Sequence, residues 1–154
     1  MKKLFLPLVL SLLCLAFVFT PTTYAATNST LSKSASVHPH VAGGGCTNYS
    51  GSSVTVGACS NINWPIANAD AYITIPASIA SMSDCEVFIY LYDSSGNRQN
   101  WQNWGCKSGY NYYGPVGISS FTGAFYGHAT VSWTTNFTTG AQTTVGGDSP
   151  VVAF

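Results

Sequence analysis

The residues best suited to chemistry are aromatic side chains that crowd between positions 88 and 113, interleaved with asparagine and glutamine. Flat rings stack on the C–H faces of sugars, and side-chain amides donate to and accept from sugar hydroxyls. A contiguous exposed patch of this kind marks an interaction site. The pattern therefore favours glycan binding, and the candidate ligand-binding residues are Tyr90, Tyr92, Trp101, Trp104, Tyr110 and Tyr112.

The same rings also have a purely structural interpretation. Side chains alternate between the two faces of a strand, so Val87, Ile89 and Leu91 face one way while Phe88, Tyr90 and Tyr92 face the other. Only one of these faces is needed for a core. The aromatic face is therefore either covered by a second layer, where ring pairs stabilise the sheet by about 0.2–1 kcal/mol each, or it is a binding platform.

Three patterns resemble catalytic sites, and none of them is complete. His128 and Ser132 share one face of a predicted strand but lie about 13 Å apart. Asp84 and Glu86 have roughly the separation that glycosidase carboxyl groups use, although acids at a strand end are usually solvated. The string at 146–150, G-G-D-S-P, has the wrong order for a serine protease. We therefore predict no catalytic residues.

The sequence does not favour a metal site or a cofactor. His38 and His40 flank a proline, but two ligands in a loop rarely hold a metal without further partners. A zinc site built from cysteines is disfavoured because the chain has no C-x-x-C pair.

The first 25 residues have the pattern of a secretory signal peptide. Lys2 and Lys3 precede an apolar run over 4–19, and Thr23 and Ala25 provide small residues before the predicted cleavage site. The run is shorter than the roughly 20 residues that a membrane span needs. We therefore predict a secreted, extracellular protein with no membrane span after cleavage.

Four cysteines remain after the signal peptide, and an even number in an exported chain predicts disulfides. Of the three possible connectivities we favour Cys46–Cys59 and Cys85–Cys106, because each closes a local loop that a hairpin can span. Each link then restricts the unfolded chain and contributes about 3 kcal/mol to stability in the loop-entropy treatment.

The elements that position the aromatic residues are predicted to be strands. Residues 85–106 form a hairpin turning at 93–97, and further strands are expected at 53–59, 70–76, 109–118, 124–134, around 143–145 and at 150–154. A loop at 61–69 should carry Trp64 and Ile66 into the core, and 77–82 can form one helical turn. The fold class is all-β, a small antiparallel β-sandwich or barrel of about seven or eight short strands.

The domain organisation follows from these segments. Residues 26–45 are rich in serine, threonine and alanine and end in three glycines, which is typical of a flexible N-terminal arm. Residues 46–154 then form a single β domain. Beyond residue 25 the chain has three fixed positive charges, Lys33, Arg98 and Lys107, against five acids, a net charge of −2. It has no basic patch, so nucleic-acid binding is disfavoured.

The sequence thus predicts a secreted, non-catalytic binding domain that recognises an extracellular glycan or another cell-surface component through exposed aromatic residues. The alternative is a secreted protease inhibitor or toxin-like effector that presents a disulfide-braced loop, such as 61–68, to a secreted or surface protein. Exposed aromatic rings favour the first hypothesis, and buried rings beside a protruding loop favour the second.

Overall fold

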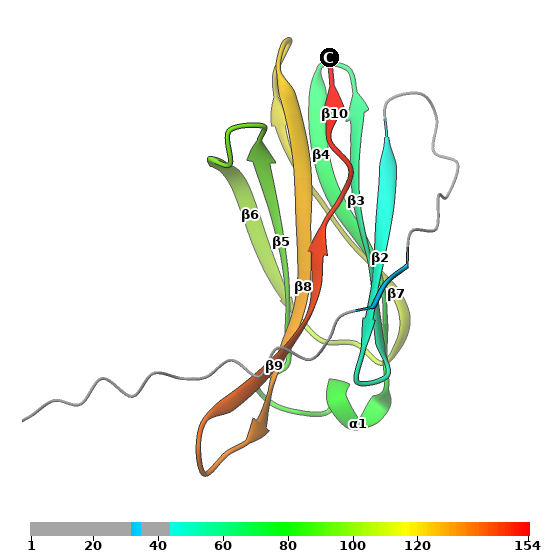
Figure 1. The fold of residues 1–154 in the computed structure, drawn as a ribbon, viewed down its shortest axis with the longest axis vertical. Coiled ribbons are helices and arrows are strands. Elements are labelled where there is room, and N and C mark those ends of the chain that lie inside the picture. The colour runs from blue at the N-terminus through cyan, green and yellow to red at the C-terminus, as the bar shows by residue number, and fades with distance from the viewer. Residues whose placement is uncertain (1–31, 35–43) are drawn as a thin grey trace, which may run out of the picture.

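The chain folds into two antiparallel sheets packed face to face, as a computed structural model that describes residues 32–34 and 44–154 shows (Figure 1). The predicted signal peptide at 1–25, the arm residues 26–31 and 35–43, and with them His38 and His40, lie outside the described residues. The predicted all-β fold is confirmed as a sandwich-like structure. The described residues form ten strands, five in each sheet. This number is larger than the seven or eight strands predicted for the domain.

Sheet A has the strand order β1-β2-β3-β4-β7, and sheet B has the order β10-β8-β5-β6. Strand β9 also belongs to sheet B: it pairs with one part of β8, and β10 pairs with another part of the same edge. The strands of sheet A are β1 (Ser32–Ser34), β2 (Gly45–Gly51), β3 (Val54–Asn63), β4 (Ile66–Ile75) and β7 (Gly109–Ser119). Those of sheet B are β5 (Glu86–Asp93), β6 (Arg98–Gly105), β8 (Ala124–Asn136), β9 (Ala141–Asp148) and β10 (Val152–Ala153). One helical turn, α1 (Ala77–Ala80), joins the sheets.

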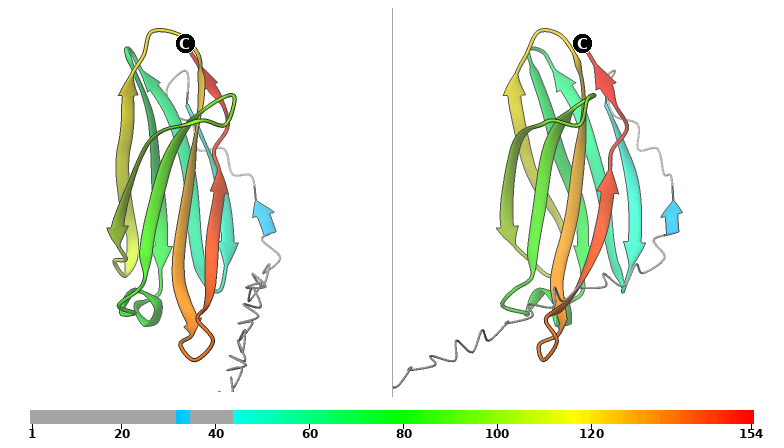
Figure 2. Two further views of the ribbon diagram at one scale, coloured as in Figure 1. Left: turned by 90° about the vertical axis from the view of Figure 1, so that its left-hand side faces the viewer. Right: turned by 60° about the vertical axis from the view of Figure 1, so that its left-hand side comes forward.

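The strands run along the long axis of the molecule, and different connections lie at its two ends (Figures 1 and 2). The β8–β9 hairpin projects beyond the sheets at the end that carries α1. The C-terminus and the β3–β4 and β7–β8 connections lie at the opposite end.

The alternation expected for the central hairpin and for β8 is confirmed. Val87, Ile89 and Leu91 are fully buried, while the aromatic residues between them remain half-buried on the outside of sheet B. Along β8 the buried positions are Phe125, Gly127, Ala129, Val131 and Trp133. Burial of every second side chain follows from the pleat of a strand with one face on the core.

The middle of the core is made of small side chains that bring the sheets close together. Ala58, Ala69 and Ala71 of sheet A are fully buried, and Ala69 lies against Gly127 of sheet B. A Cβ atom placed on Gly127 would lie 2.5 Å from the Cys59 carbonyl oxygen and 2.9 Å from the Ala69 Cβ. Position 127 of β8 therefore has no room for any residue larger than glycine.

Both predicted disulfides are present. Cys46 and Cys59 are direct partners in the β2–β3 register, with their Cα atoms 4.0 Å apart. Cys85 and Cys106 bracket the β5–β6 hairpin, with Cα atoms 5.5 Å apart, and the Cys106 amide also donates to the Cys85 carbonyl at 3.2 Å. The hairpin that carries four of the six candidate ligand-binding residues is thus closed at its base, as expected.

The turn of this hairpin is organised by Asp93. Its Oδ1 accepts from the backbone amides of Ser95 and Asn97, both at 2.9 Å, and its Oδ2 accepts from the Gln99 amide at 2.8 Å. These hydrogen bonds, the Asn97 side chain first, lower the pKa of the Asp93 carboxyl group. Gly96 adopts φ +83°, which a turn at this position requires.

The prediction of a loop at 61–69 is wrong. β3 continues to Asn63 and β4 begins at Ile66, leaving a tight connection at Trp64 and Pro65. Trp64 is 69% exposed and packs edge-on against Phe121, and Ile66 is 38% exposed, so neither side chain enters the core. The physical reason is that Ala67 and Ala69 already fill this part of the core. The side chains of Asn61 and Asn68 pair with each other across β3 and β4, so the segment forms strands.

Two further segments differ in detail from expectation. The strand at 109–118 is observed as β7, but its register with β4 is irregular between Ala69 and Ala71, opposite Gly114 and Pro115. Within the predicted arm, Ser32–Ser34 form β1, which pairs with β2. The helical turn after Pro76 is observed, and the terminal strand is observed as β10 on the edge of β8.

Candidate functional site

The outer face of sheet B carries a continuous group of rings, which we call the aromatic face: Phe88, Tyr90, Tyr92, Trp101, Tyr126 and His128. Strand register explains how these residues meet. Tyr90 is the direct partner of Trp101 on β6 and of His128 on β8, and Tyr92 is the direct partner of Tyr126. Three neighbouring strands therefore present their outward side chains in adjacent rows.

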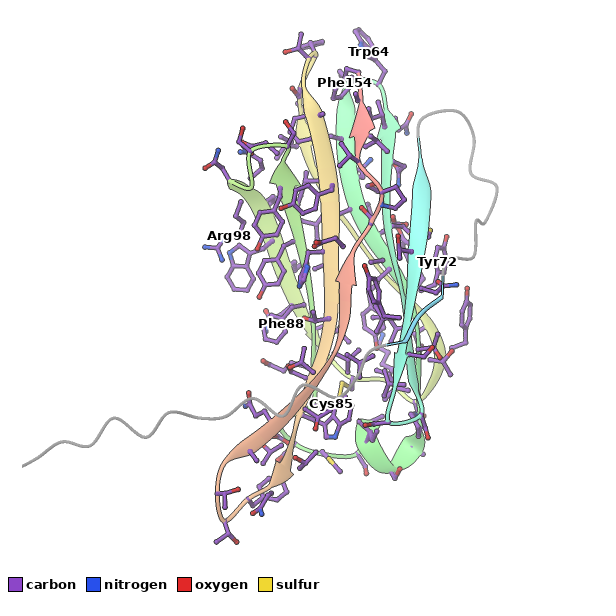
Figure 3. The ribbon with its side chains drawn as sticks, in the orientation of Figure 1. Trp64, Tyr72, Cys85, Phe88, Arg98 and Phe154 are labelled. Atoms are coloured by element: carbon purple, nitrogen blue, oxygen red, sulfur yellow. A yellow bond between two sulfur atoms is a disulfide. The ribbon has the colours of Figure 1, made fainter. Side chains whose placement is uncertain are left out.

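Three neighbouring pairs of these rings are nearly parallel, while the His128 ring is inclined by 53° to Tyr90 and by 88° to Tyr92. The Phe88 and Tyr90 rings are 6.2 Å apart and inclined by 9°, and the Tyr90 and Trp101 rings are 6.2 Å apart and inclined by 20°. The Tyr92 and Tyr126 rings are 5.3 Å apart and inclined by 16°. The Arg98 guanidinium lies 5.7 Å from the Trp101 ring and 6.0 Å from the Tyr90 ring (Figure 3). Such contacts hold the rings in place before a ligand arrives.

Polar groups surround these rings. The His128 Nδ1 lies 2.6 Å from the Asp148 Oδ1, and their side chains are 33% and 62% exposed. On the next row the Asn103 amide donates to Glu86 at 3.2 Å, and the hydroxyls of Ser132 and Thr144 lie 2.6 Å apart. The aromatic face is thus a platform of rings bordered by hydroxyl, amide and carboxylate groups.

The surroundings of two phenol groups on the aromatic face, those of Tyr90 and Tyr126, favour the protonated form. Burial raises the pKa of Tyr90. The neighbouring Tyr92 and Glu86 raise this pKa further, whereas the positive charge of Arg98 lowers it. Burial also raises the pKa of Tyr126, with further contributions from Asp148 and Tyr92. Each of these tyrosines therefore offers a hydroxyl group that can donate as well as accept at neutral pH.

The structure brings together only part of the predicted ligand-binding set. Tyr90, Tyr92 and Trp101 belong to the aromatic face, and Trp101 is the most exposed large ring there at 48%. Trp104 points inward instead: it is the register partner of buried Val87 and meets the Tyr113 ring edge-on at 6.0 Å. Tyr110 and Tyr112 belong to the other sheet.

Sequence reasoning did not select Phe88, Arg98, Tyr126 or His128 as site residues. The outward positions of Tyr126 and His128 were predicted from the alternation along 124–134. What was missing was the pairing of β5 with β8, which places them beside Tyr90 and Tyr92. No local sequence pattern indicates a contact between strands that are over 30 residues apart.

Three tyrosines gather on the outer face of sheet A, and we call them the tyrosine face: Tyr72, Tyr110 and Tyr112. The Tyr72 and Tyr110 rings are 6.0 Å apart and inclined by 11°, and the Tyr72 and Tyr112 rings are 5.3 Å apart. Beside them lies Asp70, which is only 6% exposed. Burial, followed by the charge of Asp70, raises the pKa of Tyr112 to about 12.

This pKa leads to a prediction for alkaline pH. An unfolded chain loses the tyrosine proton near the ordinary pKa of 10.0, whereas folded Tyr112 keeps it to about 12. The unfolded state therefore binds fewer protons in this window, and Tyr112 weakens the fold as the pH rises from 10 to 12. Denaturant unfolding at pH 9 and pH 11 should show a larger loss of stability for the wild type than for Tyr112→Phe. Equal losses in the two proteins would contradict the assignment.

The groups considered for catalysis have structural partners. Asp84 precedes β5, and its Oδ2 accepts from the Thr134 amide at 2.7 Å. A hydrogen bond from the Thr134 side chain, and then this backbone amide, lower the pKa of the Asp84 carboxyl group. Ser149 is buried; its hydroxyl accepts from the Gly127 amide at 2.7 Å and donates to the Pro150 carbonyl. His128 pairs with Asp148 rather than with Ser132. These contacts explain the residues as parts of the fold.

Two further observations concern the described residues alone. Within 32–34 and 44–154, no three histidine, cysteine or acidic side chains are grouped so that they could hold a metal ion. The same part of the chain contains no helix that is long and apolar enough to cross a membrane.

Comparison of the chain with protein-family models, with curated proteins and with solved structures found no match.

Proposed function

We propose that the protein is a secreted, non-catalytic domain that binds a neutral extracellular polysaccharide on the aromatic face. The observation that carries the proposal is the group of three contacting rings Trp101, Tyr90 and Phe88, in which Trp101 lies across from Tyr90 on β6 and Phe88 lies two residues along β5. Neighbouring rings in this group are inclined to each other by 20° or less on the outer face of sheet B. Pyranose rings with equatorial hydroxyls expose C–H faces that can stack on the exposed parts of such a group. The bordering amides and hydroxyls can bond the sugar hydroxyls.

Charge supports a neutral ligand over a polyanionic one. The acids Glu86, Asp93 and Asp148 lie on or beside the aromatic face, and Arg98 already contacts the Tyr90 and Trp101 rings. A polyanion would meet more negative than positive groups there. Linear glucans and chitin carry no such charge and present the apolar faces that the rings require.

The proposed export is in keeping with this ligand. The signal-peptide pattern predicts secretion, and two disulfides are consistent with an extracellular protein. A fold held by covalent links and rich in hydroxyl and amide groups is suited to that environment.

The test is retention on insoluble polysaccharide. Wild-type protein should bind at least one of cellulose, chitin, β-1,3-glucan and starch, and Trp101→Ala should weaken that binding by about tenfold, because one well-placed ring contributes about 1.4 kcal/mol or more. Phe137→Ala is the matched control: Phe137 is 73% exposed on the β8–β9 hairpin, away from the aromatic face, and its removal should leave binding unchanged. Absence of retention on all four polymers would reject the proposal.

A second candidate rests on the apolar end of the sandwich. Trp64 and Phe121 are 69% and 65% exposed and contact each other, which suits docking to a protein, such as a protease or a surface receptor. Trp64→Ala separates the two proposals: it should leave polysaccharide retention intact and would weaken only a protein complex.

A further inference from the structure

The tyrosine face is the feature of sheet A that the proposed function leaves unused. Tyr72 on β4 and Tyr112 on β7 are direct register partners, and Tyr110 is the partner of Thr74 on the following outward row. The side chains between them, Ile73 and Ile75, are buried in the core. All three tyrosines therefore lie on the outside of sheet A.

The two groups of rings lie on opposite sides of the molecule. Figure 3 shows Phe88 and Arg98 on one side of the sandwich and Tyr72 on the other. The buried core separates the aromatic face on sheet B from the tyrosine face on sheet A. One polymer chain lying on a flat surface cannot contact both groups at once.

One ring pair of the tyrosine face, Tyr72 and Tyr110, repeats the near-parallel geometry of the aromatic face, while the Tyr112 ring is tilted by 51° to Tyr72. Tyr110 is 71% exposed and Tyr112 is 49% exposed, so their rings extend into solvent. The Tyr110 ring is nevertheless held at 11° to the Tyr72 ring. Exposed rings fixed at nearly parallel orientation lose little side-chain entropy when a flat ligand stacks on them.

A polar network lies beside these rings. The Asn68 amide donates to the Asn61 side chain, and the Asn61 amide donates to Asp70, each at 3.3 Å. The Asp70 charge acts on both Tyr72 and Tyr112. An acid next to the rings disfavours polyanions, and hydroxyl groups of a neutral sugar fit the acceptors and donors of this network.

We infer that the tyrosine face is a second site for neutral polysaccharide, and that one protein molecule bridges two polymer chains held on its opposite faces. The inference rests on the proposed function, since it assigns the same class of ligand to both faces. It adds an activity that a single binding face cannot have, namely the cross-linking of polymers.

The test uses two populations of beads that carry different dyes and are coated with the polysaccharide that retains the wild-type protein. Wild-type protein at low concentration should join the two populations. The double variant Tyr72→Ala with Tyr110→Ala should still be retained on each population through Trp101, but bridging should fall by about tenfold or more. Trp101→Ala should also lose bridging while it keeps the residual retention that the tyrosine face provides. Phe137→Ala should bridge like the wild type.

The outcomes separate this inference from the proposed function. The second site is rejected if the double variant Tyr72→Ala with Tyr110→Ala joins the two bead populations as well as the wild type does. It is also rejected if Trp101→Ala abolishes all retention on the polysaccharide. In both cases binding on the aromatic face stands. If a variant with all three changes, Trp101→Ala, Tyr72→Ala and Tyr110→Ala, is retained like the wild type, neither face binds and both proposals fail. Near-ultraviolet circular dichroism and thermal unfolding of each variant verify that the sandwich is intact.

Discussion

Replacing Gly127 by valine should lower the free energy of unfolding by about 3 kcal/mol or more, a large part of the 5–15 kcal/mol that holds a typical domain together. Gly127 of sheet B lies close against β3 and β4 of sheet A. Its Cβ would meet the Cys59 carbonyl oxygen at 2.5 Å and the Ala69 Cβ at 2.9 Å. Both neighbours belong to the central strands of sheet A, so neither can move without displacing a sheet.

The variant also disturbs hydrogen bonds near the C-terminus. The Gly127 amide donates to the Ser149 hydroxyl at 2.7 Å, and the Ser149 amide donates to the Gly127 carbonyl at 2.8 Å. Forcing β8 away from sheet A strains this pair, which precedes β10. The expected result is a lower denaturation midpoint and a lower yield of folded protein.

Gly105→Val is the matched control for this prediction. Gly105 lies at the end of edge strand β6, and a Cβ there would meet no atom within 4 Å. Valine is also a favourable strand residue, so stability should change by no more than about 0.5 kcal/mol. Equal denaturation midpoints for Gly127→Val and Gly105→Val would show that the sheets are less closely packed at this layer than the distances indicate.

The parts of the fold that could be predicted are those where the sequence alternates cleanly. Along 124–134 every second residue is apolar or small, and along 86–92 aliphatic and aromatic residues take turns. A strand with one buried face imposes that period of two, so the inward and outward sides of β8 and β5 followed directly. The cysteine spacing predicted both disulfides because each pair could close a local hairpin.

The errors concern residues whose placement depends on a neighbouring strand. Trp64 appeared to be a core residue because it is large and apolar, but the core at that end is already filled by Ala67 and Ala69. Trp104 appeared to be a surface residue because amides surround it. The β6 segment is polar on both faces, so its pattern could not show that Trp104 turns inward to meet Tyr113.

The candidate site was predicted in composition but not in arrangement. Tyr110 and Tyr112 are close to Trp101 in sequence, yet after Cys106 the chain crosses to sheet A and carries them to the opposite face. Tyr126 and His128 are distant in sequence, yet β8 pairs with β5 and carries them to Tyr92 and Tyr90. Strand pairing, which sequence proximity does not reveal, decided both outcomes.

Replacing Tyr90 by alanine should weaken polysaccharide binding by roughly thirtyfold to a hundredfold, more than the loss of any other single ring. Tyr90 is the centre of the aromatic face: it contacts Phe88, Tyr92, Trp101 and His128, and Arg98 lies 6.0 Å from its ring. Its removal takes away one stacking surface and also frees its neighbours to move. Central residues of a binding surface typically cost 2 kcal/mol or more when truncated to alanine.

The comparison of Tyr90→Ala with Tyr90→Phe identifies what the central ring contributes. Phenylalanine keeps the ring and its contacts but removes the hydroxyl, so Tyr90→Phe should cost no more than about fivefold if stacking is the main contribution. Depletion isotherms on the retained polysaccharide measure both variants, and their unfolding curves should stay close to the wild type because the ring lies outside the core. If the two variants lose affinity equally, the hydroxyl group rather than the ring recognises the sugar. If neither loses affinity, the ligand does not lie across the centre of the aromatic face.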